Sequence, residues 1–208
     1  MSTDRSGFLA APSPEASAKG LLRRELLAAR ALLTKEDVAR AAVLLAGSAL
    51  LLPELAEART VAAYVSVGRE PGTRDLLEAL RERGARVLLP VLLPDNDLDW
   101  AAYEGAERLL PAGRGLLEPA GPRLGPAAVL EADAVLLPGL AVDGNGMRLG
   151  RGGGSYDRVL ARLTAAGAHP PLVVLLYENE VVAQLPSEAH DHPVDAVVTP
   201  AGTRRFAS

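Results

Sequence analysis

The fold class is indicated first by the stretch Thr60-Val-Ala-Ala-Tyr-Val-Ser66. It is a short apolar run bounded by turn residues, which is typical of a strand buried on both faces of a parallel sheet. Similar runs at residues 86–90, 133–138, 172–176 and 196–199 predict further strands. Amphipathic stretches at residues 73–83 and 155–163 predict helices between them. The alternation predicts an α/β domain with a mostly parallel sheet flanked by helices.

Two N-terminal helices are expected before this sheet. Apolar residues at three- and four-residue spacing form one stripe over residues 17–33. Thr34 followed by Asp37 resembles a capping box, so a second helix is expected to run to about residue 52, where Pro53 ends it. We interpret residues 1–16 as a disordered tail, 17–202 as a single domain and 203–208 as a C-terminal tail.

Two connecting segments have distinct patterns. Residues 92–104 contain Pro94-Asp-Asn-Asp97 between two apolar stretches, which predicts a hairpin. Residues 110–126 are rich in glycine and proline, which predicts an extended loop on the surface.

Composition excludes several classes of function. The 208 residues include no cysteine, so disulfides, thiolate metal sites and cysteine nucleophiles are excluded. The formal net charge of −4 gives no positive field to attract nucleic acid. No apolar run reaches the roughly 18 residues of a membrane span, and the N-terminus lacks a signal-peptide core. We therefore expect a cytoplasmic protein with no nucleic-acid or membrane partner. A monomer is also expected, although composition itself does not show the oligomeric state.

The strongest chemical signal is Gly150-Arg-Gly-Gly-Gly-Ser-Tyr-Asp157. Glycine lets the backbone approach a phosphate closely, and the start of the following helix presents N–H groups to an anion. Arg148 and Arg151 can add charge-assisted hydrogen bonds, and Asp157 can hold the Mg²⁺ that ATP carries. The segment is neither a Walker loop nor a dinucleotide fingerprint. A flexible hairpin followed by a helix-capping turn is the alternative interpretation.

Other candidate residues are weaker. Lys19 and Arg23 share a helix face at a spacing of four, which suits either a phosphate clamp or a solvated surface. Glu70 follows the first strand and could recognise the amino edge of a heterocycle, or be an ordinary loop acid. In His190-Asp-His-Pro-Val-Asp195, zinc binding is disfavoured because the ligand spacing of a helix is absent. Asp195 is interpreted as a structural residue or a second Mg²⁺ carboxylate.

Ligands of open parallel sheets bind beyond the carboxyl ends of the strands. Three polar segments are expected to converge there: residues 66–73, residues 139–157 and the region near Asp195. Trp100 and Tyr103 are interpreted as packing residues of the core or of a lid.

With these motifs the chain resembles the 5-formyltetrahydrofolate cyclo-ligases, also called 5,10-methenyltetrahydrofolate synthetases. The resemblance covers residues 19–200. It is carried by Leu137-Pro-Gly-Leu-Ala-Val-Asp143, Arg148-Leu-Gly-Arg-Gly-Gly-Gly154, Tyr156-Asp-Arg158, Lys19 with Leu22-Arg23, Tyr64-Val-Ser66 with Glu70 and Thr73, and the segment from Leu185-Pro186 to Thr199.

The resemblance implies a fold like that of the sugar-phosphate isomerase and CoA-transferase group. It implies conversion of 5-formyltetrahydrofolate, with ATP and Mg²⁺, to 5,10-methenyltetrahydrofolate, ADP and phosphate through an iminophosphate. The implied catalytic residues are Arg148, Arg151 and Tyr156. The implied ATP-binding residues are Lys19, Arg23, Arg148, Leu149, Gly150, Arg151, Gly152, Gly153, Gly154, Ser155 and Tyr156. The implied folate contacts are Val65, Glu70, Arg151 and Ser155, and the implied Mg²⁺ ligands are Asp157 and Asp195.

One residue departs from the family pattern. Ser155 stands where the family usually has the first of two aromatic residues, so an aromatic contact with the substrate is not expected there. Two other functions stay open on the sequence: a ligand-binding protein without catalysis, and an ATP-independent sugar-phosphate enzyme of the same fold.

Overall fold

A computed structural model describes residues 14–186 and 192–206. These residues form a central seven-stranded sheet in the order β11-β10-β9-β6-β1-β2-β3. Neighbouring strands are parallel from β10 through to β2, and the edge strands β3 and β11 are antiparallel to their neighbours. The strands are β1 (Thr60–Ala62), β2 (Arg86–Leu92), β3 (Leu98–Ala102), β6 (Ala134–Leu137), β9 (Leu172–Leu175), β10 (Ala196–Thr199) and β11 (Gly202–Arg205). The prediction of a mostly parallel α/β sheet is confirmed.

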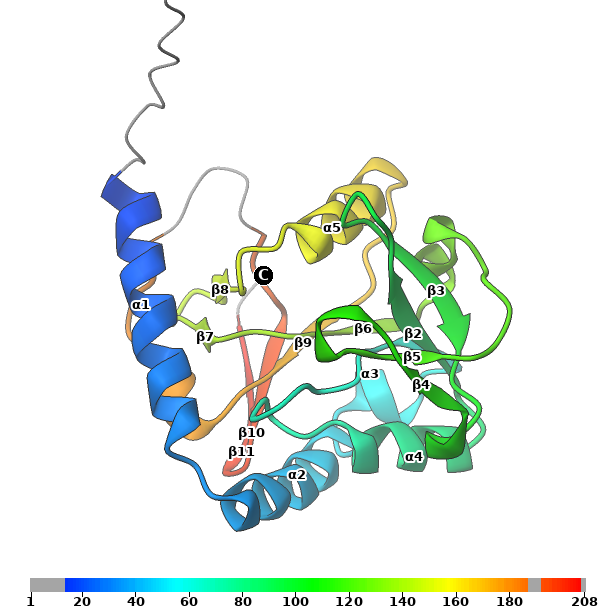
Figure 1. The fold of residues 1–208 in the computed structure, drawn as a ribbon, viewed down its shortest axis with the longest axis horizontal. Coiled ribbons are helices and arrows are strands. Elements are labelled where there is room, and N and C mark those ends of the chain that lie inside the picture. The colour runs from blue at the N-terminus through cyan, green and yellow to red at the C-terminus, as the bar shows by residue number, and fades with distance from the viewer. Residues whose placement is uncertain (1–13, 187–191, 207–208) are drawn as a thin grey trace, which may run out of the picture.

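The helices cover both faces of this sheet (Figure 1). One face packs against α2 (Lys35–Ala49), α3 (Pro53–Ala56) and α4 (Arg74–Glu82). The other face packs against α5 (Ser155–Ala165) and the short helix η3 (Pro126–Glu131). Val61 faces the first layer and Ala62 the second, as the alternation of side chains along a strand requires. The apolar runs are buried on both faces, which explains their continuous hydrophobicity.

Helix α1 (Pro14–Ala31) lies at the side of the sheet, beside a small hairpin of β7 (Ala141–Val142) and β8 (Arg148–Leu149) (Figure 1). Its Leu26 is buried with Leu140 and Leu149 in a separate apolar cluster. This packing is the reason that α1 lies next to the glycine-rich segment that follows β8.

Local signals placed most helix starts correctly. The capping box of α2 is present: the Thr34 hydroxyl accepts from the Asp37 N–H at 3.1 Å, and the Asp37 carboxylate accepts from the Thr34 N–H at 3.1 Å. The predicted hairpin of residues 92–104 is confirmed by the antiparallel pairing of β2 and β3. Pro53 stands at the first turn of α3, so it opens a helix as well as following one.

Four boundaries differ from the prediction. Helix α1 begins at Pro14, and the rest of the expected N-terminal tail, residues 1–13, lies outside the described residues. Strand β1 ends at Ala62, although the apolar run continues, because residues 63–65 are buried outside the sheet. The expected loop 110–126 is largely a second hairpin, β4 (Leu109–Pro111) and β5 (Leu117–Pro119).

The expected C-terminal tail is also partly wrong, because residues 203–205 belong to β11. This edge strand exposes most of its side chains and has no apolar alternation, so no pattern in the sequence predicts a strand there. Of the helices described here, none has the length and apolar character that a membrane span requires.

Candidate functional site

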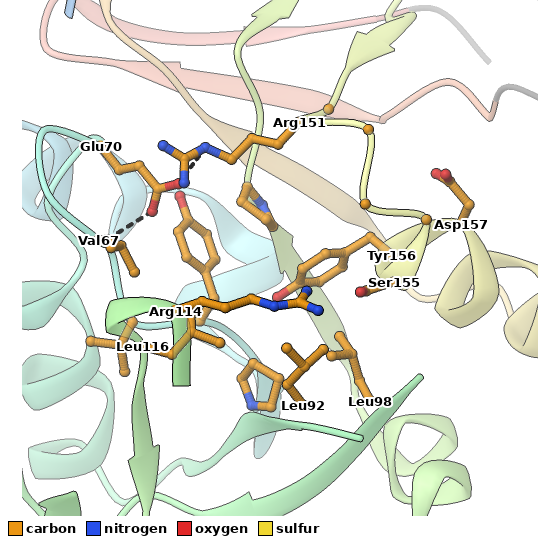
Figure 2. A pocket seen from close by; sticks show the side chains of 18 of the residues that line it. Val67, Glu70, Leu92, Leu98, Arg114, Leu116, Arg151, Ser155, Tyr156 and Asp157 are labelled. Carbon is orange, nitrogen blue, oxygen red and sulfur yellow. Dashed lines mark hydrogen bonds and ion pairs between the residues drawn. The ribbon is translucent and has the colours of Figure 1, made fainter. Parts of the chain in front are cut away.

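A cavity of about 300 Å³ opens beyond the carboxyl ends of β1 and β6 (Figure 2). Three parts of the chain form its walls. The segment after β1 contributes Tyr64, Val65, Val67 and Glu70. The β2–β3 and β4–β5 hairpins contribute Pro90, Leu92, Leu98, Arg114, Leu116, Leu117 and Glu118. The third wall is formed by Pro138, Arg148, Gly150, Arg151, Gly152, Gly153, Gly154, Ser155, Tyr156 and Asp157.

The glycine-rich segment forms a tight loop between β8 and α5. A Cβ on Gly150 would lie 2.8 Å from Nη1 of Arg148, so a larger residue would displace that side chain. Gly154 precedes α5 with φ of 77°, a left-handed conformation that glycine adopts readily. Gly154, the N-cap residue of α5, has no side chain with which to cap the first N–H groups of the helix. These N–H groups, at the positive end of the helix, form a site suited to an anion.

Arg23 links α1 to this loop. Its Nε donates to the carbonyl oxygen of Gly150 at 2.9 Å, and its guanidinium lies 3.4 Å from where a Cβ of Gly152 would be. The structure therefore brings Arg23 to the loop, and its contact with ATP stays a prediction. Lys19 is buried, with 6% of its surface exposed, and it is not among the residues that line the cavity.

Leu149 does not fit its implied role. Its side chain is 2% exposed and packs with Leu26 and Leu140, away from the cavity. Its carbonyl oxygen accepts from the Leu140 N–H at 2.7 Å. The side chain of Leu149 therefore does not reach a ligand in the cavity, and it anchors the β7–β8 hairpin to α1 through its burial.

Arg148 lies beneath the loop. Its Nη1 donates to the carbonyl oxygen of Pro138 at 3.1 Å, and its Nη2 lies 3.5 Å from Oδ1 of Asp157. The side chain of Arg148 is 7% exposed, whereas that of Asp157 is 63% exposed at the cavity mouth. Arg148 thus joins β6 to the start of α5, and the Asp157 carboxylate stays accessible to a cation.

Glu70 and Arg151 form an ion pair on one side of the cavity (Figure 2). Oε2 of Glu70 accepts from the Val67 N–H at 2.8 Å, and Oε1 lies 3.4 Å from Nε of Arg151. Ser66 and Thr73 exchange two side-chain to backbone hydrogen bonds, which fix the loop that carries Glu70. The Glu70 carboxylate is nearly buried, and it is held ready to accept from a polar ligand edge.

Tyr156 contributes a hydroxyl to the same cavity. Among the described residues its buried hydroxyl oxygen has no hydrogen-bond partner. Burial raises the pKa of Tyr156 well above its usual value, and the negative charge of Glu70 raises it further. The hydroxyl therefore stays protonated near neutral pH and can donate a hydrogen bond to a ligand oxygen. Burial likewise raises the pKa of Tyr64, with Glu70 as the next cause.

Asp195 is not part of this cavity. Its Oδ2 accepts from the Leu172 N–H at 2.7 Å, and it stands at the amino ends of β9 and β10. The cavity lies at the opposite, carboxyl edge of the parallel strands. The prediction that Asp157 and Asp195 share one Mg²⁺ is therefore wrong in this geometry. Asp195 directly precedes β10, and a residue before a parallel strand lies at the amino edge of the sheet. Its position could therefore have been predicted from the sequence.

Zinc binding by the segment from His190 to Asp195, which the sequence disfavoured, gains no support from the structure. His190 and Asp191 lie outside the described residues, and within residues 14–186 and 192–206 no group of three His, Asp or Glu side chains could hold a metal ion. Asp133 has the same structural role as Asp195: its Oδ2 accepts from the N–H groups of Arg59 and Thr60 at the amino end of β1.

Sequence reasoning missed a buried polar network behind the cavity. Arg30 of α1 donates to both carboxylate oxygens of Glu180, at 2.6 and 2.9 Å, and to the carbonyl oxygen of Gly139 at 2.7 Å. Its guanidinium lies 5.7 Å from the ring centre of Tyr177, whose hydroxyl donates to the carbonyl oxygen of Arg69. The network thus joins α1, the segment after β6 and the Glu70 loop.

Sequence reasoning also missed the wall made by the β4–β5 hairpin, including Arg114. No motif marks this wall, because its chain segment is short, rich in glycine and proline, and becomes a hairpin only by packing beside β2. The one usable signal was the pair of short apolar stretches around the turn at residues 113–115.

Comparisons with known proteins are consistent across the chain. A family model described as the 5-formyltetrahydrofolate cyclo-ligase family matches residues 15–200. The chain is 44% identical over 147 residues to the 5-formyltetrahydrofolate cyclo-ligase of Mycolicibacterium smegmatis, covering 68% of this chain and 74% of that protein. It is 36% identical over 153 residues to the Escherichia coli K12 protein of the same name, covering 71% and 81%. The solution structure of Aquifex aeolicus 5,10-methenyltetrahydrofolate synthetase matches with a TM-score of 0.77 and 29% identity, covering 91% and 93%.

Proposed function

Since the chain belongs to the 5-formyltetrahydrofolate cyclo-ligase family, we propose that it converts 5-formyltetrahydrofolate and ATP to 5,10-methenyltetrahydrofolate, ADP and phosphate. The observation that carries the proposal is the meeting of two subsites in one cavity. One is the anion site formed by the glycine loop and the start of α5, and the other is the nearly buried carboxylate of Glu70.

ATP binds with its phosphates on the loop of residues 150–154. The uncapped N–H groups of α5 and the side chain of Arg151 face the negative oxygens. Arg23 and Arg148 hold the loop in place through their bonds to the carbonyl oxygens of Gly150 and Pro138. These contacts keep the phosphates fixed, which is what phosphoryl transfer needs most.

The folate binds with its pterin amino edge on Glu70. Binding requires the Arg151 guanidinium, now 3.4 Å from Glu70, to turn toward the phosphates. Arg151 is half exposed and has few constraints, so this movement costs little. We assign the contact with the transferring phosphoryl group to Arg151, because Arg148 is buried and bonded to Pro138.

The reaction then proceeds in two displacements. The N5-formyl oxygen attacks the γ-phosphorus of ATP, and ADP leaves, which gives an iminophosphate. N10 attacks the activated formyl carbon and loses its proton, and phosphate departs with the former formyl oxygen. Charge neutralisation by arginine and N–H groups stabilises the transferring phosphoryl group. The protonated hydroxyl of Tyr156 can donate to a substrate oxygen, and no strong protein base is needed for the first step.

A Mg²⁺ ion that accompanies ATP fits one residue of this cavity. Mg²⁺ is commonly held by one or two carboxylates together with phosphate oxygens and water. Asp157 offers an exposed carboxylate at the start of α5, beside the loop that would hold the phosphates. When bound there, Mg²⁺ would supply positive charge to the phosphate oxygens. Asp195 does not take part.

The test is the rise in absorbance of the methenyl product, measured with 5-formyltetrahydrofolate, ATP and Mg²⁺ and with each omitted in turn. We expect product only in the complete mixture. Arg151→Ala should lower kcat on the order of 10²-fold or more while circular dichroism stays unchanged. The matched control is Arg158→Ala, an exposed arginine of α5 that pairs with Asp95 outside the cavity.

The outcomes separate the competing functions. Product without ATP would indicate an ATP-independent enzyme of this fold and would refute the proposal. Folate binding by calorimetry with no turnover in any mixture would identify a binding protein that lacks catalysis. A near-normal rate for Arg151→Ala would contradict the role given to that residue.

A further inference from the structure

Arg114 stands at the tip of the β4–β5 hairpin and lines the cavity. Its side chain extends along the cavity (Figure 2), and its Nη1 atom donates to Oδ1 of Asn96 at 3.1 Å in a bond that the figure does not draw. Asn96 lies in the turn between β2 and β3, and ion pairs on either side of it, Asp95 with Arg158 and Asp97 with Arg162, bind that turn to α5. The guanidinium therefore lies where the wall made by the two hairpins meets α5.

The charge of Arg114 is not balanced by a carboxylate. The other arginines lining the cavity, Arg148 and Arg151, each face a carboxylate at 3.5 and 3.4 Å. Within the described part of the chain, Arg114 forms no ion pair, and its hydrogen bond goes to a neutral amide. Glu118 on the same hairpin also lines the cavity, but its oxygens accept from the Leu92 N–H and lie near Arg123 rather than Arg114.

The backbone of Arg114 is also unusual. Its φ of 60° lies in the left-handed region, which costs a non-glycine residue about 1 kcal/mol or more. Glycines stand on both sides of it, at 113 and 115, so glycine would be the undemanding residue for this turn. Non-glycine residues in the left-handed region are concentrated at ligand-binding and active sites, so the side chain of Arg114 is a candidate for ligand binding.

The walls of the cavity offer three chemistries. Glu70 and Arg151 lie at one end, Leu92, Leu98 and Leu116 supply apolar surface, and the Arg114 guanidinium lies away from Glu70. Figure 2 shows Glu70 on the side away from Leu92 and Leu98, with the Arg114 side chain running between them. A reduced folate carries groups that suit these walls: a polar pterin edge at one end, a benzoyl ring, and a glutamate with two carboxylates at the other end.

We propose that Arg114 binds the glutamyl carboxylates of the folate substrate and sets the preference of the enzyme for that anionic end. This proposal rests on the proposed function and deepens it. On binding, the guanidinium exchanges the Asn96 amide for a carboxylate, which is a stronger acceptor. Because the turn is at the surface, further γ-linked glutamates can extend into solvent past it.

The test compares two substrates: 5-formyltetrahydrofolate and its diamide, in which both glutamyl carboxylates are neutral. Arg114→Gly removes the side chain and suits the left-handed turn, so the hairpin is retained. We expect its KM for the diacid to rise about tenfold while kcat stays nearly unchanged. A rise of this size corresponds to the loss of one charge-assisted hydrogen bond. Its KM for the diamide should equal that of the wild type. Arg114→Lys should recover part of the loss.

Arg108→Ala is the matched control, since Arg108 is an exposed arginine just before β4 that pairs with Glu104 and does not line the cavity. It should leave both KM values unchanged. An equal rise in KM for the diacid and the diamide would show that Arg114 only holds the hairpin to Asn96, and it would overturn the proposal. So would an unchanged KM for the diacid.

Calorimetry without ATP keeps this test separate from the proposed function. If the wild type binds the diacid more tightly than the diamide, and Arg114→Gly removes the difference, the subsite stands even in the absence of turnover. If the two compounds bind the wild type equally, the subsite is refuted even where turnover is normal.

Discussion

The buried pair of Arg30 and Glu180 gives the sharpest prediction about stability. Their side chains are 4% and 1% exposed. Glu180 accepts three hydrogen bonds on its two oxygens: two from Arg30, at 2.6 and 2.9 Å, and one from the Tyr177 N–H at 2.9 Å. Burial by itself lowers the pKa of Arg30, but the hydrogen bond and charge of Glu180 raise it above its usual value. Arg30 is therefore charged at every pH at which the protein folds.

Glu180→Gln keeps the volume but removes the charge and one acceptor. The new NH₂ group must face an N–H donor, and Arg30 keeps a buried charge without a counterion. Losing one partner of a buried pair costs about 3–5 kcal/mol, and we expect about 3 because one oxygen is retained. With a urea m-value of about 2–3 kcal/mol/M, the unfolding midpoint should fall by roughly 1–1.5 M.

Urea unfolding followed by fluorescence and circular dichroism measures this change. Glu104→Gln, in the exposed pair with Arg108, is the control and should cost less than about 1 kcal/mol. The double variant Arg30→Met with Glu180→Gln should be more stable than Glu180→Gln alone, because the uncompensated charge is gone. A loss below about 1 kcal/mol for Glu180→Gln would refute the reasoning.

Three further predictions concern the loop and the sheet edges. Gly150→Ala should lower kcat/KM on the order of tenfold, because the added Cβ displaces Arg148. Gly153→Ala should keep most activity, because the space around its Cβ position is open. Equal values of kcat/KM for the two variants would contradict this reasoning. Asp195→Ala should cost about 1 kcal/mol in urea unfolding and leave the Mg²⁺ dependence of the rate unchanged; an increased Mg²⁺ requirement would restore its role as a ligand. The hydrogen bond from Arg162 lowers the pKa of Asp97, so this pair stabilises the fold above the unfolded pKa of about 3.9. Asp97→Asn should therefore be less stable by about 1 kcal/mol at pH 7, and the difference should vanish as the pH falls through the folded pKa; a difference that persists in acid would point to another cause.

Much of the fold could be predicted because its signals are local. The capping box of Thr34 and Asp37 uses residues three apart, and the buried strands are continuous apolar runs. Likewise, the glycine loop and the first turn of α5 form one continuous segment, so an anion site could be predicted from their order. The hairpin of β4 and β5 could not, since its strands are three residues each and their pairing depends on packing beside β2.

The candidate site was predictable only in part. The sequence predicted that Glu70, Arg148 and Arg151 would meet, because they follow strands that end at one edge of a parallel sheet. It misplaced Asp195, which precedes its strand and lies at the other edge. It assigned Leu149 to a ligand because of its neighbours in the motif, although that side chain points into the α1 cluster.

By itself, then, the sequence determined the α/β class, the order of the elements and the glycine-rich loop before α5, since periodicity and glycine spacing encode burial and backbone shape along a continuous chain. Tertiary structure alone decided which distant polar atoms meet. Arg30 finds Glu180 across 150 positions of sequence, and Arg114 reaches Asn96 across the cavity mouth. The physical reason is that a charged side chain takes whatever partner the packed layers bring within about 3 Å, and no local pattern records that partner.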